Sequence, residues 1–146
     1  KLVVADSFSE VASLSEKLGG WMQWLTMKLA PGVLIKSMEK VYQGPHMEDA
    51  LHYFRESLAH QDKKQILKAR AALNRFNITE RLESMNAPTL VLVGDGFGKF
   101  AIQMAQKTAN AIPGADFKVL QGGLDPSNMV VKEAFDREML NFIHHT

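Results

Sequence analysis

The sequence predicts an α/β fold in which three parallel strands carry two flanking helices and a long helical insertion. Three short runs, near 1–5, 89–94 and 116–120, contain the β-branched or aromatic residues Val and Phe among other apolar residues, which is typical of strands. The middle run, TLVLV, is apolar at every position after Thr89, as expected of a strand buried on both faces in a parallel sheet covered by helices. The segments between the runs have helical composition and spacing, which completes an α/β pattern.

The first strand leads into a predicted helix. Ser7 and Glu10 are three residues apart, the spacing at which a serine hydroxyl accepts a backbone N–H and a glutamate reaches back to the cap residue. We therefore expect Ser7 to cap a helix that begins there. Asp6 closes strand 1–5 at the carboxyl end of the sheet, where ligand sites lie in parallel sheets. We interpret Asp6 as a turn or cap residue, with a functional role as the alternative.

Residues 10–85 are predicted to be helical. This segment lacks strand alternation and is rich in Leu, Met, Ala, Lys and Glu, which favours four or five helices. Apolar residues at three- and four-residue spacing in the 46–76 part indicate helices that are buried on one side. The expected breaks are at Gly19-Gly20, Pro31-Gly32 and Gly44-Pro45.

The rest of the chain predicts a strand, a helix, a strand and a helix, preceded by a short helix. The elements we expect are a short helix ITERLESM capped by Asn77 and Glu80, strand 89–94, helix 100–111 ending at Pro113-Gly114, strand 116–120, and a last helix capped by Ser127 and Asn128.

The stretch from Ala87 to Ile143, which begins APTLVLVGDGFGKF and contains LQGGLDP, resembles the end of an α/β-hydrolase domain. LVVADSF near the start resembles the strand that follows the nucleophile strand and helix in that family. The resemblance implies a single partial domain with a strand and turn at 1–9, a helical cap-like insertion at 10–85 and the C-terminal strand-helix-strand-helix at 86–146. Because the sequence starts inside a strand, we expect a fragment that lacks the first half of the family's domain.

The catalytic positions that the resemblance implies hold the wrong side chains. In the family a G-x-x-D loop after the first of these strands carries the catalytic acid, and a GGH or GH loop after the second carries the histidine. Phe97 stands at the acid position and Leu124 at the histidine position, and no serine lies in a GxSxG pattern. Asp95, two residues before the acid position, is interpreted as a turn residue beside Gly96, with a functional carboxylate as the alternative.

A cluster of large apolar side chains marks a candidate substrate pocket in the cap-like segment. Trp21, Met22, Trp24 and Met27 are close in sequence and could line a pocket for an acyl or alkyl chain, because Trp offers a large apolar area and Met adapts its shape. Ordinary packing of a core or an interface is the alternative interpretation.

Composition excludes several other classes of function. With 17 basic and 16 acidic side chains, the net charge of +1 provides no field suited to nucleic acid or an anionic membrane. The sequence has no cysteine, and His46 and His52 are six residues apart, which does not suit a metal site. Lys99 replaces the third glycine of a dinucleotide fingerprint in GDGFG, so we expect neither a metal nor a cofactor. Without a signal or membrane-spanning segment, a soluble, cytoplasmic protein is expected.

Three functions remain as hypotheses. The leading one is a catalytically incomplete C-terminal portion of an α/β-hydrolase that associates with another chain, its own copy or an N-terminal half, through an open sheet edge. The first alternative is an ester, lactone or acyl hydrolase of the serine type, completed by that N-terminal half. The second alternative is a module that binds small apolar ligands.

Overall fold

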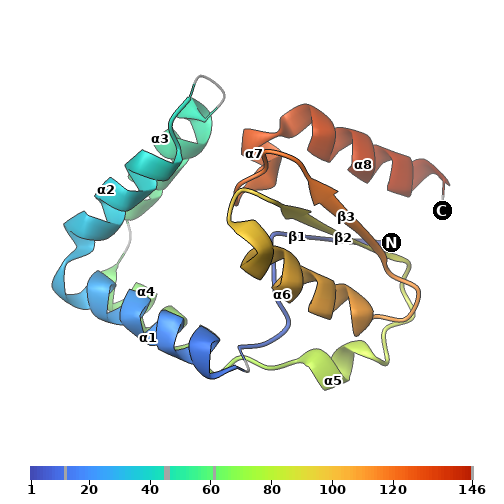
Figure 1. Ribbon diagram of the computed structural model, residues 1–146, viewed down its shortest axis with the longest axis horizontal. Coiled ribbons are helices and arrows are strands. Elements are labelled where there is room, and N and C mark those ends of the chain that lie inside the picture. Colours follow the sequence, from blue (N-terminus) through green and yellow to red (C-terminus); the bar gives the residue numbers. More distant parts are fainter. Residues whose placement is uncertain (12, 45–46, 61, 146) are drawn as a thin grey trace. The chain divides into compact units, whose positions relative to one another are not determined.

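A computed structural model of the protein describes residues 1–11, 13–44, 47–60 and 62–145, and at 58 and 59 the backbone alone. The chain folds into two compact units: the sheet unit, 1–9 and 78–146, and the helical unit, 10–77. None of the described helices is long and apolar enough to cross a membrane. In chain order the elements are β1 (Leu2–Ala5), α1 (Leu14–Leu29), α2 (Pro31–Val41), α3 (Glu48–His60), α4 (Lys63–Leu73), α5 (Thr79–Leu82), β2 (Thr89–Gly94), α6 (Gly98–Asn110), β3 (Asp116–Leu120), α7 (Ser127–Val130) and α8 (Lys132–His145) (Figure 1).

The three predicted parallel strands are confirmed, and they form one sheet. The strand order is β1-β2-β3, with Leu2 opposite Thr89 and Leu90 opposite Asp116. Helix α6 covers one face of this sheet and α8 the other (Figure 1). The sheet unit therefore has three layers, and its central strand is covered on both sides.

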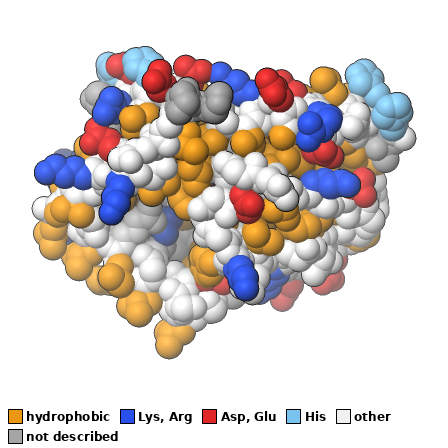
Figure 2. All heavy atoms as spheres, turned by 45° about the horizontal axis from the view of Figure 1, so that its top comes forward, with side chains coloured by type: hydrophobic (Ala, Val, Ile, Leu, Met, Phe, Trp, Pro, Cys, Tyr) orange, Lys and Arg blue, Asp and Glu red, His pale blue; other side chains and the backbone are white. Residues whose placement is uncertain are grey.

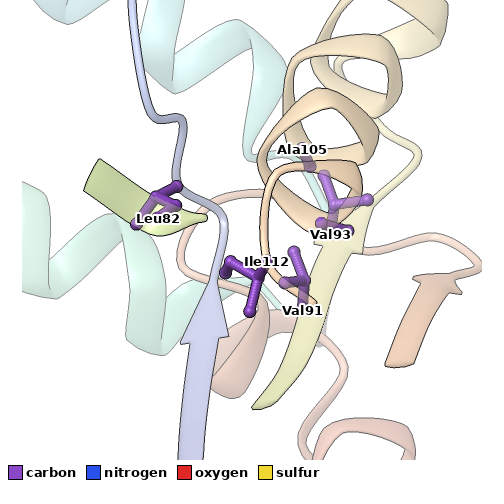
Figure 3. Packing of buried hydrophobic residues seen from close by; sticks show 6 residues of the cluster. Leu82, Val91, Val93, Ala105 and Ile112 are labelled. Carbon is purple, nitrogen blue, oxygen red and sulfur yellow. The ribbon is translucent and has the colours of Figure 1, made fainter. Parts of the chain in front are cut away.

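Strand β2 alternates its side chains between two apolar layers, because successive residues of a strand point to opposite faces. Val91 and Val93 are 0% and 4% exposed, as predicted, and pack with Leu82, Ala105 and Ile112 on the α6 side (Figure 3). Leu90 and Leu92 face the other way, where the buried side chains of Leu120 and Phe142 complete the second layer. This burial on both faces explains why the strand is apolar from Leu90 to Val93.

The first helix begins later than predicted. Ser13, not Ser7, caps α1, where its hydroxyl accepts the N–H of Glu16 at 3.2 Å and the Glu16 carboxylate accepts the Ser13 N–H at 2.9 Å. The Ser7 hydroxyl instead donates to the carbonyl of Ala5 at 2.9 Å. Glu10 forms an antiparallel bridge with Asn77. Ser7 and Glu10 therefore make strand and loop contacts. Ser13 and Glu16, which have the same spacing six residues later, start the helix.

The predicted break at Gly19-Gly20 is also wrong, because both glycines lie inside α1. Gly20 is buried against α4, where a Cβ would overlap the side-chain amide of Asn74. A glycine here allows close approach of two helices rather than a turn. The break at Pro31 is confirmed, since α2 starts with this residue, and Pro45 of the third predicted break lies outside the described residues.

Two further predicted caps differ from the structure. Ile78, not Asn77, precedes α5, and it makes no side-chain capping hydrogen bond. Ser127 is the first residue of α7 rather than a cap of α8. Its hydroxyl bonds to Asp6 across the sheet unit, as described below.

Helix α1 leaves much of its apolar surface uncovered. It packs on α2 and α4, while one stripe of its side chains is exposed. In the view of Figure 2, hydrophobic side chains are exposed among charged side chains. The exposed apolar residues of α1 are Leu14, Leu18, Trp21, Met22, Leu25 and Leu29.

Candidate functional site

The loops that follow the three strands meet at one edge of the sheet, since the carboxyl ends of parallel strands lie together. Asp6 follows β1, Asp95 follows β2, and the loop 121–126 follows β3. Hydrogen bonds link all three loops, and these bonds define the candidate site.

Asp6 is the hub of these links. Its carboxylate accepts the N–H of Gly94 at 3.1 Å, the N–H of Ser127 at 2.7 Å and the Ser127 hydroxyl at 2.8 Å. The backbone of Asp6 has a φ of +47°, in the left-handed region that aspartate tolerates better than most residues. Asp6 thereby ties the end of β1 to the end of β2 and to the first residue of α7, a wider role than a turn or a cap within its own segment.

Asp95 links the other two loops. Its Oδ1 accepts the N–H of Gly122 at 2.7 Å, and its carbonyl accepts the N–H of Gly98 at 2.8 Å in a turn. The N–H of Gly96 donates to the carbonyl of Gly123 at 2.8 Å. The turn interpretation of Asp95 describes its backbone, while its carboxylate also holds the loop after β3.

The two loops are in close backbone contact through glycines. A Cβ on Gly94 would overlap the carbonyl and Cα of Gly123. A Cβ on Gly96 would lie 2.5 Å from a methyl group of Leu124, whose side chain is buried. Phe97, on the first loop, is 50% exposed. The structure thus brings together the loops that carry the implied acid and histidine positions, and both positions hold side chains without an ionisable group.

A second carboxyl group lies beside Asp6. Partial burial raises the pKa of Asp125, and the negative charge of Asp6 raises it further, although the residue as a whole is exposed. Both carboxyls border a pocket of about 150 Å³. Its apolar wall consists of Phe8, Val93, Phe97, Phe100, Ala101 and Met104.

Asp125 and the linking role of Asp6 were not predicted from the sequence. The available signal was positional, because each residue follows the carboxyl end of a predicted strand, in VADSF and in LQGGLDP. That position marks a place near the sheet edge, but it does not reveal which loops the side chain joins.

The predicted apolar pocket residues are divided between two pockets of the helical unit. Trp21 and Trp24, whose ring centroids are 5.6 Å apart, line a pocket of about 480 Å³. Met27 lines another of about 170 Å³, between α1, α2 and α4, and Met22 is 63% exposed. A role for these side chains in binding substrate stays a prediction. The other residues around the tryptophans, which were not singled out from the sequence, are Lys17, Ala71, Asn74 and Arg75.

Comparison with known proteins identifies the fold. No protein-family model matches the sequence, and no curated protein matches it. Solved structures do match, among them an esterase from Exiguobacterium antarcticum (TM-score 0.77, 13% identity), the enol-lactonase from Burkholderia xenovorans LB400 (0.73, 17%) and an alpha/beta hydrolase enzyme from a Medee basin deep-sea metagenome library (0.70, 14%).

The alignments cover nearly all of this chain but only about half of each similar structure. They cover 97%, 97% and 99% of this chain but only 56%, 55% and 56% of the esterase, the enol-lactonase and the metagenomic hydrolase. The chain therefore spans about half the length of the structures it matches. With the parallel sheet, the helices on both faces and the two joined loops, the chain has the fold of the C-terminal portion of an α/β-hydrolase.

Proposed function

We propose that these 146 residues form a catalytically incomplete C-terminal portion of an α/β-hydrolase-fold protein. The observation that carries this proposal is the pair Phe97 and Leu124, which stand at the implied acid and histidine positions on loops joined by the Gly96–Gly123 hydrogen bond. A serine hydrolase needs a histidine to take the proton of the nucleophile and an acid to orient that histidine. A phenyl ring and a leucine side chain can do neither.

The direct experiment is an ester hydrolysis assay of the purified chain. With p-nitrophenyl butyrate we expect no release of nitrophenolate above buffer, because there is no general base at these two positions. Saturable turnover that remains with the chain through repurification would contradict the proposal.

The active-hydrolase alternative has its own expected result. Structures of similar fold include an esterase and an enol-lactonase, so esters and lactones are the substrates to test with a complementary N-terminal half added. In that complex, Leu124→His should raise the rate by about 10²–10⁴-fold, the usual contribution of general acid–base catalysis. If the complex hydrolyses esters without this substitution and Asp125→Asn abolishes the activity, the base has moved to Asp125.

We propose, in addition, that β1 pairs with a strand from outside these residues. The N–H groups of Leu2 and Asp6 donate to Pro88 and Leu92 on the β2 side, so those of Val3 and Ala5 point to the opposite edge, since strand N–H groups alternate in direction. Among the described residues, β2 is the only strand that pairs with β1. An apolar strand with an unpaired edge is a template for another strand.

The pairing of β1 is tested by size and by hydrogen exchange. We expect light scattering to show a dimer or larger species at micromolar concentration, with slow exchange of the Val3 and Ala5 amides. A monomer with fast exchange at these two amides would contradict edge pairing. A monomer with slow exchange would mean that the chain itself covers the edge.

A further inference from the structure

The larger pocket of the helical unit, between α1 and α4, has an apolar wall and a cationic rim. Its volume of about 480 Å³ lies within the range of roughly 300–1,000 Å³ typical of small-molecule sites. Trp21 and Trp24 form the apolar wall with rings inclined at 52°. Lys17 from α1 and Arg75, just after α4, bring two positive charges to the same pocket.

These cations have no acidic partners in the described part of the chain. Neither Lys17 nor Arg75 forms an ion pair with a described residue. With no ion-pair partner among the described residues, these two positive charges are available to an anionic ligand. The chain as a whole is almost neutral, so this concentration of positive charge is local.

The polar side chains of Arg70 and Asn74 also lie next to this pocket. The Nε of Arg70 and the Oδ1 of Asn74 are buried and have no hydrogen-bond partner, although buried polar groups are nearly always paired. Both side chains border Gly20, and Asn74 also lines the pocket. Burial lowers the pKa of Arg70, as expected of a guanidinium with little water and no counter-charge. Asn74, which lines the pocket, therefore presents there a buried polar atom that no described residue satisfies.

We propose that this pocket binds a small organic carboxylate with an aromatic or aliphatic body. The carboxylate lies against Lys17 and Arg75, where the planar guanidinium offers two parallel donors. The body lies against Trp21 and Trp24, which provide a large rigid apolar surface. None of the residues that line this pocket belongs to the loops after the strands, so the proposal goes beyond hydrolase-like function and stands without it.

The chain provides its own reporter for this binding. It contains two tryptophans, and both line the pocket, so intrinsic fluorescence reports on the site directly. We would titrate the whole chain with 4-phenylbutyrate and, in parallel, with its neutral amide, 4-phenylbutyramide. We expect a saturable change of emission with the carboxylate, at least about 10-fold weaker binding of the amide, and weaker carboxylate binding at high salt.

Charge-removal variants separate this site from general surface binding. Arg75→Gln and Lys17→Gln should each weaken 4-phenylbutyrate binding by about 2- to 5-fold, the range expected for one exposed charge contact. Lys68→Gln removes the same charge from α4 at an exposed residue outside the pocket lining and should leave the affinity unchanged. Circular dichroism would verify that each variant keeps its helices.

Three results would overturn the proposal. These are no saturable change with the carboxylate, equal affinity for the carboxylate and the amide, or equal loss in Lys68→Gln and the two pocket variants. If Arg75→Gln loses helical structure, Lys17→Gln, on the other helix, carries the test alone.

Discussion

Replacing Gly94 by alanine tests the contact between the two loops that carry the implied catalytic positions. The new Cβ would overlap the carbonyl and Cα of Gly123, which are backbone atoms and cannot rotate away. Relief requires the loop after β3 to move, and that movement would break the bond from Gly96 to Gly123 at 2.8 Å and the bond from Gly122 to Asp95 at 2.7 Å.

The expected cost follows from these two effects. Overpacking costs about 1–3 kcal/mol, and each of the two lost hydrogen bonds about 0.5–1.5 kcal/mol, so Gly94→Ala should lower the free energy of unfolding by about 2–6 kcal/mol. This is a large share of a typical total of about 5–15 kcal/mol.

Urea denaturation followed by far-ultraviolet circular dichroism measures this cost, with Gly19→Ala as the matched control. Gly19 lies in α1 with nothing within 4 Å of a new Cβ, so alanine should stabilise the helical unit by about 0.5–1 kcal/mol. If Gly94→Ala unfolds within about 0.5 kcal/mol of the parent chain, the loops are not in the contact described here.

Four further substitutions test the site and the core. The raised pKa of Asp125 means that its favourable contribution is present at acid pH, below the ordinary aspartate pKa, and is lost as pH rises through the folded-state pKa. Asp125→Asn should therefore stabilise the chain at about pH 7, by less than about 1 kcal/mol because the residue is exposed. At about pH 3 it should have no such effect. Equal effects at the two pH values would contradict the raised pKa of Asp125. Val91→Asp should abolish soluble folding, whereas Val119→Asp, at a position 40% exposed, should still fold. Asp95→Ala should cost about 1–2 kcal/mol in urea denaturation through the lost bond to Gly122, and no loss would mean that the bond is not formed.

The sheet could be predicted because its central strand is apolar enough to require burial on both faces. A run such as TLVLV, apolar from Leu90 to Val93, is expected only where both faces of the strand are covered, and Val91 and Leu92 indeed lie in opposite layers. The loops after β2 and β3 could be placed for a different reason. Their glycines, in GDGFG and QGGL, stand where backbones approach closely, and the resemblance to a known fold aligned them.

Capping could not be settled from spacing alone. Ser7–Glu10 and Ser13–Glu16 share the same spacing, and tertiary contacts decided between them, since the Ser7 hydroxyl bonds to the end of β1. The pair Asp6–Ser127 was equally inaccessible, because 121 residues separate its members and no local pattern reports a contact at that range. The sequence predicts a helix break at Gly20 for a similar reason. Only the position of α4 shows that Gly20 packs against that helix.

The central claim is that Phe97 and Leu124 stand at the acid and histidine positions of a hydrolase fold. The most direct measurement is the imidazole pKa of the introduced histidine, followed by NMR titration, in Leu124→His and in the double substitution Phe97→Asp/Leu124→His. If the two positions face each other, the new carboxylate should raise that pKa by about one unit or more, since a carboxylate within about 4–6 Å favours the imidazolium. The same pKa in both variants, with the fold intact, would contradict the claim.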